Sequence, residues 1–220
     1  MRWQGRRESG NVEDRRGSRG GLIAGGGIGT IVIALLIYFL GGDPSQVMDT
    51  QPGAAQRQMS PAEEAKEDEA ASFVKVVLAD TEDVWNKLFA EQNADYPEPT
   101  LVLFRDAVQS GCGAASSQSG PFYCPSDQKV YIDLSFYEEL ESRFSAPGDF
   151  AMAYVIAHEV GHHIQTITGR SQTLARARGQ VSETEYNKLS VKLELQADFL
   201  AGVWAHHAQR MNNILEAGDI

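Results

Sequence analysis

The sequence predicts an α+β fold, namely a mostly helical single domain with a small β-sheet, preceded by an N-terminal transmembrane helix. Apolar residues recur at helical spacing in long stretches between residues 60 and 211. Residues 100–104 and 129–134 are rich in the branched and aromatic residues that favour strands. Residues 20–42 carry no charge and are long enough to cross a bilayer as a helix. A chain of 220 residues accommodates one domain and these additional segments.

The distribution of charge predicts an orientation in the membrane. The net charge of −11 argues against a nucleic-acid-binding protein, because such surfaces need an excess of Lys and Arg. Residues 1–19 nevertheless contain six arginines and only three acidic residues. Positive residues favour the cytoplasmic side of a membrane helix. We therefore expect a basic cytoplasmic tail at residues 1–19, a single-pass anchor in the cell membrane at residues 20–42, and a periplasmic or extracellular domain after it.

Residues 20–42 allow other interpretations as well. A cleaved signal peptide has a similar charge pattern, but its apolar region is typically about 7–15 residues and ends in a small-residue cleavage site. The longer run found here favours an uncleaved anchor. Gly21, Gly25 and Gly29 are spaced four residues apart, a pattern that can pair two membrane helices in a homodimer. Glycine is also common in membrane helices that do not pair.

The domain itself is expected at residues 60–220. A polar segment with proline and glycine, residues 43–59, precedes it and is typical of a flexible tether. Ser60–Glu63 forms a capping box that begins a helix, and a second cap at Thr81 predicts that two consecutive helices follow. The prolines of Tyr96–Pro99 end this helical region, ahead of the two predicted strands.

Two long helices are expected in the last third of the chain. The first begins at Asp149 and runs to about Thr168, where Gly169 stops it. The second begins at a capping box, Ser182–Glu185, and runs to about Met211.

Cys112 and Cys124 are the two cysteines of the chain, and they bracket a segment rich in Gly and Ser. In an exported domain such a pair is expected to form a disulfide, worth about 3 kcal/mol by the loop-entropy argument. A zinc site built on these cysteines is disfavoured, because no histidine lies near them to complete the ligand set.

A metal-binding motif lies in the first of the two long helices. On an α-helix, residues i and i+4 share one face about 6 Å apart along the axis, so His158 and His162 can hold one ion. Glu159 points about 100° away from His158 and can reach a water on that ion without being a ligand. This is the HExxH arrangement of zinc hydrolases, and it predicts one Zn²⁺ ion as cofactor.

The last predicted helix supplies the remaining groups of such a site. A catalytic zinc ion needs a third protein ligand, and Glu194 is the expected one. Asp198 lies four residues later on the same face, where it can accept the outer N–H of a ligand histidine and hold the ring in place. The competing interpretation is an amphipathic helix whose acidic residues face the solvent.

The other three histidines are expected to have ordinary structural roles. His163 points away from the ligand face and is expected to pack or to form a hydrogen bond. His206 and His207 lie two to three turns beyond Asp198 and are expected at the surface. The less favoured alternative is that one of them stabilises an oxyanion or acts as a ligand.

The chain resembles the YpfJ-like family of bacterial neutral zinc metallopeptidases, which are membrane-anchored HExxH proteins. The similarity extends over nearly the whole sequence. Its segments are Met1–Gly17, Gly120–Pro125, Val130–Leu134, His158–Gln165 and Glu194–Asp198. The resemblance implies a zinc-dependent peptidase with a zincin-like fold. Members generally continue beyond this length, and Glu216–Ile220 resembles the start of another helix, so we expect a further C-terminal segment to be missing.

Two functional hypotheses follow. The first is a membrane-anchored zinc peptidase in which Glu159 takes a proton from the attacking water and delivers it to the leaving amine. Its substrate, a peptide or protein, would align along the edge of the strand at 129–134. The alternative is a non-catalytic, zinc-stabilised membrane scaffold or assembly factor. Its site would be closed by a fourth protein ligand such as His163 or His206.

Overall fold

The computed structural model describes residues 1–17, 59–144 and 148–219. The anchor predicted at residues 20–42, with its glycine pattern, and nearly all of the tether predicted at 43–59 lie outside the described residues. Among the residues that are described, no helix combines the length and apolar composition that a membrane crossing requires.

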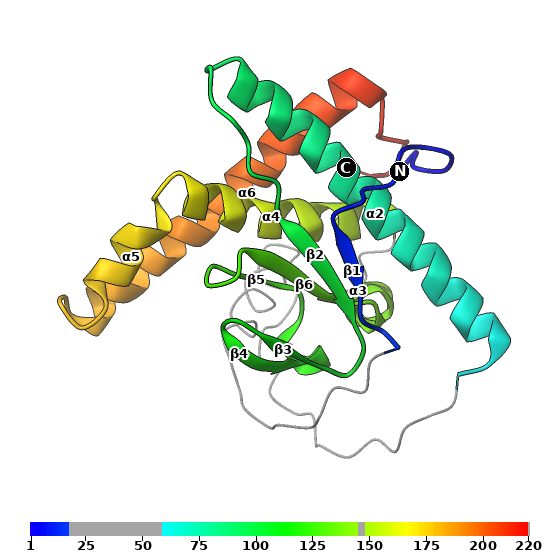
Figure 1. Ribbon diagram of the computed structural model, residues 1–220, viewed down its shortest axis with the longest axis horizontal. Coiled ribbons are helices and arrows are strands. Elements are labelled where there is room, and N and C mark those ends of the chain that lie inside the picture. The colour runs from blue at the N-terminus through cyan, green and yellow to red at the C-terminus, as the bar shows by residue number, and fades with distance from the viewer. Residues whose placement is uncertain (18–58, 145–147, 220) are drawn as a thin grey trace.

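Six short strands form two sheets in the described part of the chain. They are β1 (Val12–Asp14), β2 (Thr100–Phe104), β3 (Ala107–Ser110), β4 (Gly113–Ser116), β5 (Phe122–Cys124) and β6 (Lys129–Asp133). The main sheet has the order β1-β2-β6-β5, and β3 and β4 form a separate hairpin (Figure 1). β1, β2 and β6 are parallel, whereas β5 pairs antiparallel with β6. The two predicted strands are confirmed as β2 and β6. The other four have only three or four residues each, too few to give a recognisable alternation.

Five α-helices and one 3₁₀ turn are described. They are α2 (Pro61–Ala90), α3 (Ser135–Phe144), α4 (Asp149–Ile167), α5 (Ser171–Ala177), α6 (Glu183–Asn212) and the turn η2 (Ser117–Ser119). The predicted capping box at Ser60 is present, and Glu63 forms both of its hydrogen bonds. The predicted second cap at Thr81 is wrong. Thr81 is buried, and its hydroxyl donates to the carbonyl of Leu78 within the same helix, so α2 continues through it.

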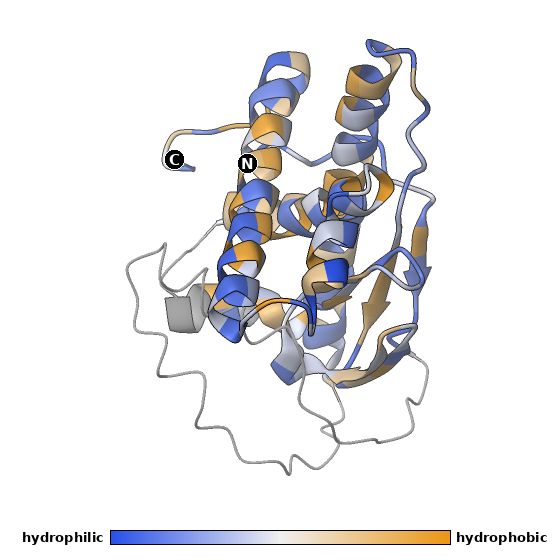
Figure 2. Cartoon of the chain, turned by 90° about the vertical axis from the view of Figure 1, so that its left-hand side faces the viewer, coloured by the Kyte–Doolittle hydropathy of each residue, from blue (hydrophilic) through white to orange (hydrophobic). Residues whose placement is uncertain are grey.

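The core lies between the sheet and a layer of helices. α4 lies against the sheet, and α2 and α6 pack on α4. Leu101 and Leu103 of β2 face this helical layer, while Val102 and Phe104 face the opposite side, toward the β3–β4 hairpin. Strand β2, of sequence TLVLF, is the most hydrophobic of the long strands. The helices alternate between hydrophobic and hydrophilic residues, as expected for helices buried on one side (Figure 2). The fold is therefore a single α+β domain with a small sheet, as predicted.

Residues 1–17 pack onto this domain as well. β1 adds a parallel strand beside β2, and the side chains of Met1 and Trp3 belong to the main core. The sequence predicted that the domain begins at residue 60 and did not include residues 1–17, because they have no apolar periodicity of their own. The contacts that hold them on the domain are formed with parts of the chain far away in sequence.

The segments at the other end also form local structure. After α6, residues Glu216–Asp219 form a turn closed by a 3.3 Å contact between the Asp219 N–H and the Glu216 carbonyl, in place of the expected start of a helix. The predicted disulfide is confirmed, with a distance of 5.8 Å between the Cα atoms of Cys112 and Cys124. It ties the turn of the β3–β4 hairpin to the edge strand β5.

α4 and α6 cross at a glycine. A Cβ atom added to Gly161 would lie 2.9 Å from the carbonyl oxygen and 3.1 Å from the Cα of Ala197. Both of these atoms belong to the backbone of a long helix and cannot turn aside. Glycine at position 161 therefore sets how closely the two helices approach.

Gly161→Ala should lower the free energy of unfolding by about 1–3 kcal/mol, because the added methyl group must push the two helices apart. Denaturation with urea, followed by circular dichroism, measures the change. Gly202→Ala is the matched control, since it lies in α6 where an added Cβ meets no atom within 4 Å. The control should be neutral or stabilising by up to about 1 kcal/mol. Equal stability of both variants would contradict the role assigned to Gly161.

Candidate metal centre

The residues of the HExxH motif project from the buried part of α4. Apolar residues such as Val155, Ile156 and Val160 hold this helix against its neighbours and are almost wholly inaccessible to solvent. The helix ends at Ile167 with Thr168 as its cap, and Gly169 follows with φ of 78°, a conformation that favours glycine. The motif therefore lies on a long helix that is fixed by packing on several sides.

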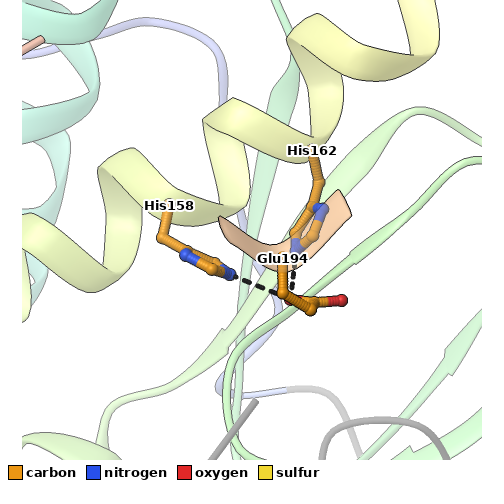
Figure 3. Close-up of side chains that lie close together, drawn as sticks. All are labelled: His158, His162 and Glu194. Carbon is orange, nitrogen blue, oxygen red and sulfur yellow. Dashed lines mark ion pairs between the residues drawn. The ribbon is translucent and has the colours of Figure 1, made fainter. Parts of the chain in front are cut away.

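The crossing of α6 over α4 brings Glu194 to the two predicted histidine ligands. His158 and His162 both point to Glu194, one helical turn apart (Figure 3). The Oε2 atom of Glu194 lies 3.4 Å from Nε2 of His158 and 3.2 Å from Nε2 of His162. One ligand atom of each residue lies within 4.8 Å of the others.

The two distances between Glu194 and the imidazoles match what a tetrahedral zinc ion requires. Two ligand atoms that each lie about 2.1 Å from a tetrahedral ion are about 3.4 Å apart. Nε2 of His158 and Oε2 of Glu194 are also buried without a hydrogen-bond partner. Buried polar atoms are rarely left unpaired in proteins. Two imidazoles and one carboxylate, with unpaired atoms directed at one point, thus fit a zinc ion.

Hydrogen bonds on the far side of each ring fix its orientation. Nδ1 of His158 lies 2.9 Å from Oδ1 of Asp198, which also accepts a 3.1 Å hydrogen bond from the hydroxyl of Tyr154. Nδ1 of His162 lies 3.0 Å from Oε1 of Gln165. With the proton on Nδ1 in each case, the lone pair of Nε2 faces Glu194.

Asp198 lies at the place that the sequence predicted, but Gln165 and Tyr154 were not predicted. Gln165 is three residues after His162, and Tyr154 is four residues before His158, so helical spacing could have indicated both. The amide of Gln165 is itself held, because its Nε2 donates to the carbonyl of Leu193 at 2.6 Å.

The electrostatics of the cluster favour a cation. Burial lowers the pKa of His158, but the hydrogen bond to Asp198 and the contact with Glu194 outweigh it and raise the pKa to about 10. The pKa of His162 is also raised, since Glu194 outweighs the effect of its burial. Burial raises the pKa of Glu194, and the two histidines outweigh it and lower the pKa to about 2. The carboxylates therefore stabilise positive charge at the point where the three side chains meet.

Glu159 lies beside this cluster and is not part of it. Its side chain is 1% exposed, and neither carboxylate oxygen has a hydrogen-bond partner. Burial raises its pKa, while the nearby His162 and His158 oppose this effect. A buried, unpaired carboxylate with a raised pKa has the properties of a group that accepts and returns a proton.

The three remaining histidines lie outside the cluster. His163 is buried and forms hydrogen bonds on both sides of its ring, 3.2 Å to the hydroxyl of Tyr123 and 2.6 Å to the carbonyl of Pro97. Burial lowers its pKa. It therefore has the structural role expected of it. His206 and His207 line a shallow hollow on the surface of α6, and neither joins the candidate ligand cluster found among the described residues.

Comparison with known proteins identifies relatives over the full length of the chain. The family described as "Putative neutral zinc metallopeptidase" matches residues 1–220. "Uncharacterized protein YpfJ" of Escherichia coli K12 is 46% identical over 230 residues, which cover 100% of this chain and 79% of that protein. "Uncharacterized protein Rv2575" of Mycobacterium tuberculosis is 37% identical over 174 residues, 77% of this chain and 58% of that protein.

No solved structure matches the chain significantly. The family match covers every residue of the sequence, and the ligand cluster combines the two histidines of the HExxH motif with Glu194 of α6. On this evidence the chain belongs to the neutral zinc metallopeptidase family.

Proposed function

We propose that this protein is a peptidase that uses one Zn²⁺ ion, held by His158, His162 and Glu194, to hydrolyse peptide bonds. One observation carries the proposal: three ligand atoms meet within 4.8 Å, next to the buried and unpaired carboxylate of Glu159. When bound, zinc supplies a Lewis acid that polarises a carbonyl group and lowers the pKa of water to about 7.

The protein supplies the proton transfers and the orientation of the site. Glu159 takes a proton from the attacking water on one of its carboxylate oxygens and delivers it to the nitrogen of the leaving amine. Its burial keeps solvent from competing for that proton. Asp198 and Gln165 hold the two imidazole rings so that their Nε2 atoms keep facing Glu194.

The ligand count supports catalysis over the alternative of a zinc-stabilised scaffold. A structural zinc site is closed by four protein ligands, whereas a catalytic site has three and an open position. Across the described ranges, only three candidate ligands come together. His163 is not available as a fourth, because Tyr123 and Pro97 occupy its two ring nitrogens.

The edge of the sheet offers a place for an extended peptide. The predicted strand for this role, residues 129–134, does not have a free edge, because β6 lies between β2 and β5. β5 pairs only with β6 among the described strands, and it contacts α4, which carries the HExxH motif. We therefore assign the alignment of a peptide substrate to the backbone of β5, by antiparallel or parallel pairing at its open edge.

Glu159→Gln should abolish hydrolysis and leave the zinc content unchanged, because the amide keeps the shape of the side chain but cannot accept the proton. The measurement is cleavage of a broad peptide library by the purified full chain, together with metal analysis of the same sample. Glu64→Gln, an exposed glutamate of α2, is the control and should retain activity and zinc. Turnover retained by the Glu159 variant would exclude this residue as the base.

Asp198→Asn should weaken zinc binding by about 10- to 100-fold, because the neutral amide no longer polarises the Nδ1–H of His158. Competition with a chromogenic chelator measures the affinity. Asp95→Asn, an exposed aspartate in the loop after α2, should leave the affinity unchanged. If the two variants bind zinc equally well, Asp198 has no part in holding the ligand.

A further inference from the structure

Residues 1–17 form an N-terminal arm that is held by the domain through many separate contacts. We propose that the arm and the domain at residues 59–219 fold as one unit and lie on the same side of any membrane that the protein meets. This differs from the topology expected from the sequence, in which a single crossing at residues 20–42 puts them on opposite sides. The inference does not depend on the proposed peptidase activity.

The start of the arm is part of the hydrophobic core. Met1 and Trp3 are only 6% and 8% exposed. The ring of Trp3 packs edge-on against Phe73 of α2, with centroids 5.4 Å apart. Its indole N–H donates a 2.9 Å hydrogen bond to Asp149, the first residue of the helix that carries the HExxH motif. Met1 also lies close to the other end of the chain, its amine 3.3 Å from Asp219, and the two ends lie near each other in Figure 1.

Two buried carboxylates of α2 depend on the arm. Asp80 is 3% exposed and pairs with the guanidinium of Arg6 through two nitrogens. Glu82 is 2% exposed, and the hydrogen bonds to its carboxylate come from the arm: Arg7, Ser9 and Asn11. Burying a carboxylate is costly unless it is paired. The sequence of α2 thus places its acidic residues where the arm supplies their partners.

The arm also completes the sheet. Arg15 donates its backbone N–H to the carbonyl of Leu103 at 2.8 Å, and Leu101 donates to the carbonyl of Asn11 at the same distance. Without β1, the edge of β2 would be open, although the side chains of β2 are almost entirely buried. An open edge on a buried strand is unfavourable and prone to aggregation.

The arginines that suggested a cytoplasmic tail have protein partners instead. Five of the six in residues 1–19 are described, and each forms an ion pair. Arg16, for example, pairs with Asp68 of α2 at 3.0 Å. Residues 20–42 provide 23 uncharged positions, enough for about one crossing of a bilayer but not for two. One crossing would separate every one of the contacts between arm and domain, so the contacts and a single crossing are incompatible.

Cysteine labelling in cells tests the proposal with the full chain. Cys112 and Cys124 are both replaced by serine, because their disulfide would be reduced in the cytoplasm. An introduced cysteine is then the sole thiol of the chain on either side of the membrane. Gly10→Cys places it on the arm, where an added Cβ meets no atom within 4 Å, and Ala94→Cys places it on an exposed loop of the domain. Intact bacterial spheroplasts are treated with a membrane-impermeant maleimide, and the same treatment is repeated after lysis and after denaturation.

We expect both positions to give the same pattern, either labelled before lysis or labelled only after it. Labelling after denaturation confirms that each thiol is reactive. If one position is labelled before lysis and the other only after lysis, the arm and the domain lie on opposite sides and the proposal is overturned.

A second measurement tests whether the arm is docked. Arg6→Ala should lower the melting temperature of the purified full chain by about 5 °C or more, because it leaves the buried carboxylate of Asp80 without its main partner. Arg15→Ala removes the same charge from the same arm, but the ion pair of Arg15 is with Glu13 inside the arm. Its effect should be at most about 2 °C. Equal shifts in the two variants would show that the arm is not held by the domain.

Discussion

The close crossing of α4 and α6 is the contact on which the candidate site depends. It is possible because residue 161, within the HExxH motif itself, is a glycine that lies against the backbone of Ala197. Ala197 is three residues after Glu194 and one before Asp198. The contact that sets the distance between the helices therefore also places a candidate ligand and a ring-orienting carboxylate opposite His158. The HExxH segment of α4 therefore has two roles, since Gly161 forms the helix contact and His158 and His162 are the candidate ligands.

Four acidic side chains of this protein are held in place by specific positive or hydrogen-bonding partners. The net charge of −11 comes from an excess of acidic residues, and two groups of these can be distinguished by their partners. Glu194 and Asp198 surround the two ligand histidines and favour a cation between them. Asp80 and Glu82, on the buried side of α2, receive arginines and polar groups from residues 1–17. Asp80 and Glu82 are buried, and Glu194 and Asp198 are partly buried. In both places water is too scarce to solvate the carboxylates fully, so a positive or hydrogen-bonding partner is needed.

Local sequence patterns accounted for much of the fold and for the core of the site. Spacing along one helix was sufficient to group His158 with His162, and a capping box located the start of α2. To predict Glu194 as the third ligand, only one long-range contact had to be assumed, namely that the helix carrying Glu194 (α6) packs against the helix carrying the two histidines (α4). The strand assigned to substrate alignment was wrong, because the order of strands in a sheet depends on contacts between distant segments. The predicted cap at Thr81 was wrong because a threonine can either cap a helix or lie inside one. Its burial in the folded protein, which depends on distant segments, places Thr81 inside α2.

By itself, the sequence located the three long helices α2, α4 and α6, two central strands, the disulfide and the residue types of a zinc site, because these follow from periodicity and from short-range spacing. Only the tertiary structure decided that β5 is the edge strand beside α4, that Gln165 and Tyr154 support the histidines and their partner, and that residues 1–17 contribute a strand and two core side chains. The arm has no apolar period, so nothing local indicates that it folds. Its stability comes from backbone pairing with β2 and from carboxylates more than fifty residues away, which only the folded chain brings together.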